Sequence, residues 1–124
     1  MATVSGELIA ESLRVGTPLE GVALSVEKIS RADAGDVTAG QPLTWTFIEF
    51  RAALEDVDTL AAALSTALDS ELGWYCDFRS ADETFVVFAG RVFRYPRGDD
   101  VRRAEAEEYA RSRGVPESQL DWPE

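Results

Sequence analysis

The spacing of hydrophobic residues along the chain predicts four or five β-strands. Residues 21–31 alternate between apolar and polar side chains, which is the period of a half-buried strand. A bulge near Lys28 would also turn Ile29 toward the interior. Gly90-Arg91 fits a two-residue hairpin turn, although Gly90 could instead mark a bulge in one long strand. The other strand segments are rich in aromatic and β-branched residues and cover residues 43–51, 74–79, 84–89 and 92–95.

A helical spacing of apolar residues appears in two further segments. The first follows Asp56, a candidate N-cap, and Gly73 can end it. The second runs from about Val101 to Arg113, with Asp99 or Asp100 as its cap. The apolar positions of the first helix are Val57, Leu60, Ala61, Leu64, Ala67 and Leu68.

The N-terminal segment has two interpretations. Residues 5–14 are predicted as a short helix, because Leu8, Ile9 and Leu13 fall on one side of it. Ile9, Leu13 and Val15 are also separated by even numbers of residues, so they would point to one face of an extended chain, as in an edge strand. The periodicity leaves both open.

The order of these elements predicts a two-layer α+β sandwich in a single domain spanning residues 1–124. Strands joined by hairpins, with helices between them, indicate an antiparallel sheet of four to five strands with helices packed mainly on one face. Residues 32–41 are expected to form a loop because they are rich in glycine and aspartate. Leu120 and Trp122 are expected to fold back onto the core, since an apolar pair on a loose tail would be unusual.

Composition excludes several function classes. The chain has 23 acidic and 12 basic residues, for a net charge of −11, which repels nucleic acid and anionic membranes and favours a basic protein partner. Histidine is absent, so the commonest general base and most transition-metal sites are missing; we expect no metal and no cofactor. The N-terminus lacks the pattern of a signal peptide and no segment is long enough to span a bilayer, so a cytoplasmic location is expected.

Cys76 is the single cysteine, so an internal disulfide is excluded. In the predicted strand, Trp74 and Phe78 lie two positions before and after Cys76 and would point to the same face. These aromatic neighbours predict that the thiol is buried in the core. A reactive cysteine needs a base or a positive field to lower its pKa, and the sequence around Cys76 supplies neither. We therefore expect no catalytic role for this thiol.

Two sets of polar residues are candidate ligand-binding groups. Tyr75, Asp77 and Arg79 share the other face of the predicted strand and could orient a polar ligand, although a solvated face is the simpler interpretation. Arginines around Tyr95 could hold an anion, but pairing with the protein's own acids is favoured. Arg94 and Tyr95 are the candidates from this second set, whose arginines are Arg91, Arg94, Arg97, Arg102 and Arg103.

Three hypotheses of function follow from these observations. The absence of a catalytic motif favours a non-catalytic interaction or regulatory module that binds a basic protein. The alternative is a small-molecule-binding domain or minor enzyme that uses Tyr75, Asp77 and Arg79. A homo-oligomeric module is the third, and a homodimer is compatible with either of the others. Aromatic residues are expected in the core first and at an interface second; they are Trp45, Trp74, Trp122, Tyr75 and Tyr95.

Overall fold

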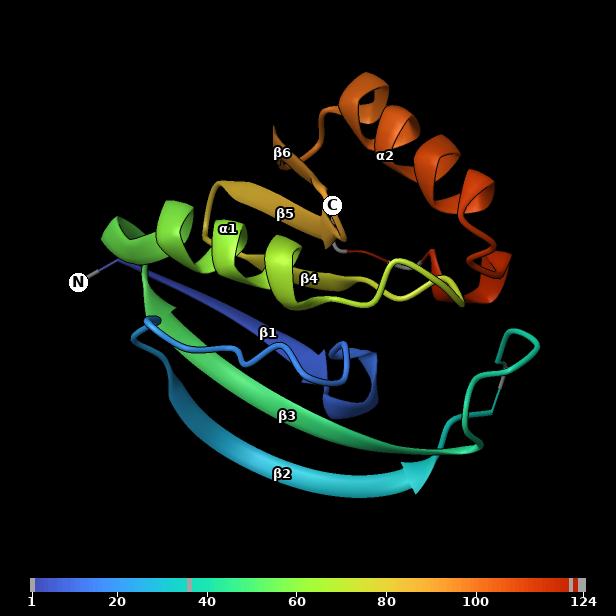
Figure 1. Ribbon diagram of the computed structural model, residues 1–124. Helices are drawn as coiled ribbons and strands as arrows, with labels where there is room; N and C mark the ends of the chain where they lie inside the picture. The colour runs from blue at the N-terminus through green and yellow to red at the C-terminus, as the bar shows by residue number, and fades with distance from the viewer. Residues whose placement is uncertain (1, 36, 121, 123–124) are drawn as a thin grey trace.

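The computed structural model describes residues 2–35, 37–120 and 122, which form a six-stranded antiparallel sheet with two α-helices packed against it (Figure 1). The predicted α+β class and two-layer arrangement are confirmed, with six strands in place of the expected four to five. The strand order is β2-β3-β1-β4-β5-β6. The strands are β1 (Thr3–Ile9), β2 (Ser25–Asp33), β3 (Thr44–Ala53), β4 (Cys76–Arg79), β5 (Glu83–Phe88) and β6 (Arg91–Pro96), and the helices are α1 (Val57–Ala67) and α2 (Asp100–Ser112).

The additional strand is β1, so the helix predicted over residues 5–14 is wrong. Val4 and Leu8 are buried on the side of the sheet that faces α1, and Gly6 lies between them in the β1–β4 ladder opposite Phe78. The edge-strand alternative was right about the conformation and wrong about the position, because β1 lies between β3 and β4. A short 3₁₀ turn replaces the rest of the expected helix.

Strand β2 forms one edge of the sheet, as Figure 1 shows. It begins at Ser25, later than predicted, and the expected bulge is present between Val26 and Lys28. The prediction that Ile29 turns inward is wrong, since its side chain is 63% exposed. At an edge strand, a side chain has a neighbouring strand on one flank only. A bulge and a lysine are features that discourage pairing with another edge; a homodimer stays a prediction.

The first helix is shorter than predicted. It ends at Ala67, well before Gly73, because Leu68 adopts an extended conformation and forms an isolated bridge with Leu13. Asp56 occupies the N-cap position, but its side chain makes no capping hydrogen bond. Of the residues described, no helix has both the length and the apolar character needed to cross a bilayer.

The C-terminal half agrees closely with prediction. Asp99 caps α2, and its carboxylate accepts a hydrogen bond of 3.0 Å from the backbone N–H of Arg102. β5 and β6 form a hairpin, but its two-residue turn is Ala89-Gly90, one residue earlier than predicted. Gly90 has a φ of +76°, a conformation that glycine adopts without strain.

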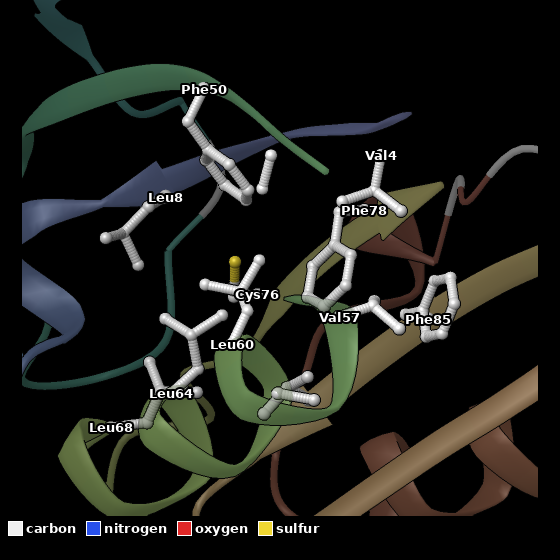
Figure 2. Packing of buried hydrophobic residues seen from close by; sticks show 13 residues of the cluster. Val4, Leu8, Phe50, Val57, Leu60, Leu64, Leu68, Cys76, Phe78 and Phe85 are labelled. Carbon is white, nitrogen blue, oxygen red and sulfur yellow. The ribbon is translucent and has the colours of Figure 1, made fainter. Parts of the chain in front are cut away.

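The core divides along β5 because successive side chains of a strand point to opposite faces. Phe85 and Val87 belong to the cluster under α1, whereas Val86 and Phe88 belong to the cluster under α2. At this end of the sheet, α1 and α2 therefore contact opposite faces, which departs from the expected packing of the helices mainly on one face. Figure 2 shows the α1 cluster, in which apolar side chains of the helix point toward those of the sheet.

The predicted fold-back of the C-terminal segment is confirmed. Leu120 and Trp122 are 8% and 2% exposed and pack in the α2 cluster with Tyr95. Trp45 and Trp74 are also buried, as expected for aromatic residues of the core, and form a third cluster on the side of the sheet opposite α1.

Candidate functional site

The five candidate ligand-binding residues do not form one site. Asp77 and Arg79 alternate with the α1-facing side chains of β4 and therefore point to the opposite side of the sheet. Tyr75 precedes β4 and packs on that opposite side. Arg94 faces α1, and Tyr95 is 1% exposed beneath α2. Burial also raises the pKa of the Tyr95 phenol.

Arg94 is held by the protein's own acids, as the sequence favoured. Its Nε and Nη2 donate to the two carboxylate oxygens of Glu83 at 2.8 Å each, and its Nη1 lies 3.2 Å from Oδ1 of Asp58. The guanidinium carbon also lies 4.9 Å from the ring centroid of Phe85. The hydrogen bonds to Glu83 raise the pKa of Arg94 and lower that of the Glu83 carboxyl. The guanidinium of Arg94 is thus engaged by Glu83, Asp58 and Phe85 within the protein.

Two further arginines of the basic set are engaged elsewhere. The guanidinium of Arg91 lies over the ring of Phe93, at 4.7 Å from its centroid. Arg103 forms an ion pair with Glu107 at 3.5 Å and donates to the backbone carbonyl of Trp122. Arg91, Arg94 and Arg103 therefore do not converge on a common anion site.

The prediction that Cys76 is a buried core residue is confirmed. Its side chain is 1% exposed, its Sγ lies 3.5 Å from the backbone carbonyl oxygen of Glu7, and burial raises the pKa of the thiol. The expected sharing of a face with Trp74 is wrong. Because β4 begins at Cys76, Trp74 lies outside the strand alternation and packs against Trp45, with ring centroids 5.1 Å apart.

The side of β1, β3 and β4 that faces away from α1 carries charged side chains in two rows. We call this surface the open face and the two rows the acidic row and the basic row. In the acidic row, Glu7 of β1 is directly opposite Glu49 of β3 and Asp77 of β4. Directly opposed residues have Cβ atoms about 4.5–5.5 Å apart, so the row brings three acidic side chains together. Its outer end is partly neutralised, because Lys28 lies 3.6 Å from Glu49.

The basic row lies two residues along the same strands. Ser5 of β1 is opposite Arg51 of β3 and Arg79 of β4. Arg51 pairs with Glu27 of β2 at 3.6 Å. Within the described part of the chain, no cluster of three or more acidic or cysteine side chains is arranged to hold a metal ion.

A pocket of about 190 Å³ lies beside the acidic row, between the sheet and the C-terminal segment. Gln119 and Ser118 of that segment form one wall, and Ile9 contributes from the end of β1. The side chains that give the pocket its chemistry are Glu7, Trp45, Phe47, Trp74, Tyr75 and Asp77.

Hydrogen bonds hold two of these aromatic residues in place. The indole N–H of Trp45 donates to the backbone carbonyl of Pro42 at 2.8 Å. The phenol of Tyr75 donates to the backbone carbonyl of Gln119 at 2.7 Å and so ties the C-terminal wall to the start of β4. Trp45 and Trp74 are tilted by 56° relative to one another. These two hydrogen bonds hold the side chains of Trp45 and Tyr75 at the pocket.

A more open depression adjoins the pocket and shares Glu7 and Asp77 with it. This depression extends along the open face to Arg51 and Arg79 of the basic row. The sequence placed Tyr75, Asp77 and Arg79 together, whereas the structure puts Tyr75 and Asp77 at the pocket and Arg79 in the neighbouring depression.

Sequence reasoning missed Glu7 as a member of this site. The residue fell in a segment predicted to be helical, and its alternation with Val4 and Leu8 was the available signal. Trp45 and Phe47 are two residues apart in the predicted strand 43–51 and so share a face, but nothing in the sequence shows which other residues that face meets.

The arrangement combines carboxylates with aromatic rings, and both attract cations. The side chains that line the pocket include no histidine and no cysteine, the usual partners in nucleophilic catalysis. Comparison of the chain with models of known protein families, with curated protein sequences and with solved structures finds no match to any of them.

Proposed function

We propose that this protein is a non-catalytic interaction module that binds a basic partner protein on its open face. The single observation that carries the proposal is the acidic row, in which Glu49, Glu7 and Asp77 stand side by side on adjacent strands. Three carboxylates on adjacent strands give this part of the open face a negative charge, which attracts the cationic groups of a partner.

The charge of the whole protein supports the same partner. A net charge of −11 attracts basic proteins over distances of about 10 Å at 0.1 M salt and speeds their encounter. The basic row beside the acidic row would set the orientation of a partner, because Arg51 and Arg79 repel a cation that docks one row away. Charge attraction would therefore speed the encounter with the partner, and the acidic and basic rows would determine how the partner is aligned on the open face.

The alternative of a small-molecule-binding domain or minor enzyme has less support. It requires Tyr75, Asp77 and Arg79 to converge on one ligand, but Arg79 lines the depression next to the pocket that the other two line. Arg94 lies across the sheet from them and is engaged by Glu83.

The test is the binding of a labelled oligolysine peptide, measured by fluorescence anisotropy at about 0.02 M and about 0.3 M salt. We expect the double variant Glu7→Gln, Asp77→Asn to bind about two- to fivefold more weakly at low salt, as loss of exposed charge contacts predicts. The matched control is the double variant Glu20→Gln, Glu55→Gln, which also removes two exposed charges, both from positions outside the sheet.

Equal weakening by the double variant and the control would mean that only net charge matters, and would refute docking on the open face. Binding that does not respond to salt would equally contradict the proposal. Circular dichroism of each variant verifies that the fold is retained.

A further inference from the structure

We infer that the pocket beside the acidic row binds an alkylammonium group, the cationic group of a lysine side chain. This inference rests on the proposed function and adds the position and the chemical class of the cation. In this pocket, carboxylates and several aromatic side chains line the same cavity.

The aromatic rings are close enough together to act on one cation. The ring centroid of Trp45 lies 5.1 Å from that of Trp74 and 6.1 Å from that of Phe47. A cation within about 6 Å of a ring centroid is attracted by the ring's quadrupole, and tryptophan gives the strongest attraction. Because Trp45, Phe47 and Trp74 all line the pocket, a cation in it would lie next to more than one aromatic side chain.

The two carboxylates complete the recognition of an ammonium group. Glu7 and Asp77 are directly opposite one another in the β1–β4 ladder, and both line the pocket. An ammonium is a compact point charge with three donors that rotate freely, so it can serve two carboxylates and meet ring faces at the same time. An anion would be repelled by the carboxylates, and a neutral ligand could donate hydrogen bonds to them but would gain no attraction between opposite charges.

The size and surroundings of the pocket favour an alkylammonium over a larger planar cation. Its volume is about 190 Å³, below the range of about 300–1,000 Å³ that sites for drug-sized ligands occupy. Ile9 and Phe47 offer apolar surface to an alkyl stem, in the way that lysine side chains bury their methylene groups. The arginines of the basic row prevent the cation from sliding along the open face.

The probe for this inference is n-butylammonium chloride, with n-butanol as the uncharged control of similar length. The ¹H–¹⁵N spectrum resolves the indole N–H of each tryptophan, and tryptophan-to-phenylalanine variants assign the three signals. We expect butylammonium to shift the signals of Trp45 and Trp74 in a saturable manner, with little effect of butanol at the same concentration and ionic strength. The signal of Trp122, which does not line the pocket, should move least.

Variants then separate the pocket from general charge. The double variant Glu7→Gln, Asp77→Asn should weaken butylammonium binding at least about fivefold, which corresponds to about 1 kcal/mol. The control double variant Glu20→Gln, Glu55→Gln, which also removes two charges, should leave the affinity nearly unchanged. Phe47→Leu keeps an apolar residue at a half-buried position and should weaken binding about two- to fivefold through the lost cation–π contact. Unchanged affinity in the Glu7→Gln, Asp77→Asn variant would overturn the inference.

Peptides distinguish this inference from the proposed function. If oligolysine shifts the Trp45 and Trp74 signals and oligoarginine does not, both the docking surface and its lysine pocket are supported. If both peptides bind the open face equally and butylammonium shifts neither signal, the pocket inference fails and the docking proposal survives. If butylammonium binds while no basic peptide does, the pocket serves a free amine, and the docking proposal fails.

Discussion

Replacing Gly6 with alanine tests how closely β1 approaches β4. Gly6 lies on the α1-facing side of β1, between Phe50 of β3 and Phe78 of β4, whose ring centroids are 6.0 Å apart in an edge-to-face arrangement. A Cβ at this position would lie 2.5 Å from the Cβ of Phe78 and 2.5 Å from the backbone oxygen of Asp77. Neither neighbour is the end of a flexible side chain, so the strands themselves would have to move.

Two effects of opposite sign determine how much Gly6→Ala changes the free energy of unfolding. Alanine restricts the unfolded chain, which stabilises a protein by about 0.4–1 kcal/mol where the native backbone accepts it. Overpacking a tight core costs about 1–3 kcal/mol, and contacts of 2.5 Å at Gly6 place this case toward the upper end. We therefore expect Gly6→Ala to lower the free energy of unfolding by about 1–2.5 kcal/mol, which is an overpacking cost of about 2–3 kcal/mol less a gain of about 0.4–1 kcal/mol.

Urea unfolding followed by tryptophan fluorescence measures this change. Trp45, Trp74 and Trp122 are all buried, so their emission reports on the loss of tertiary structure. Ser5→Ala is the control, because Ser5 lies next to Gly6 but on the open face, and its effect should stay within about 0.5 kcal/mol. A Gly6→Ala variant as stable as the wild type, or more stable, would refute the close approach of the two strands.

Two further predictions concern titration and reactivity. The folded state lowers the pKa of Glu83, so its ion pair with Arg94 contributes fully above the pKa of the unfolded carboxyl and is lost as the pH falls through the lower folded value. Glu83→Gln should therefore cost about 0.5–1 kcal/mol at pH 7, and urea titrations should show this gap closing well below about pH 4; a gap independent of pH would contradict the pairing. Burial and the raised pKa of Cys76 predict that a thiol reagent labels the native protein slowly and the urea-unfolded protein at once; rapid native labelling, followed by absorbance, would show that the thiol is accessible.

Much of the fold follows from local signals in the sequence. The Asp99 cap and the glycine of the β5–β6 turn act over a few residues, and both elements form close to where those residues predict them. The run of aromatic and β-branched residues around Phe85 likewise predicted β5. Such signals depend only on neighbouring residues along the chain, so they can be recognised in the sequence without knowledge of the tertiary contacts.

The N-terminal strand shows where local reasoning fails. The spacing of Leu8, Ile9 and Leu13 is compatible with a helix, and isolated short helices gain little stability from propensity alone. β1 is instead stabilised by hydrogen bonds to strands on both sides, β3 and β4, which lie far from it in the sequence. The same dependence on partners explains Ile29: its apolar character predicted burial, but the position of β2 at the sheet edge leaves it exposed.

The sequence by itself determined the α+β class, the acidic charge, the absence of imidazole and the burial of the single thiol. The tertiary structure alone decided which charged and aromatic side chains meet. Glu7, Trp45 and Asp77 come from three strands widely separated along the chain, and they line one pocket because the registers of β1 with β3 and β4 bring them onto the same face. A shift of one residue in either register would send those side chains to opposite faces, and that register depends on packing across the whole sheet.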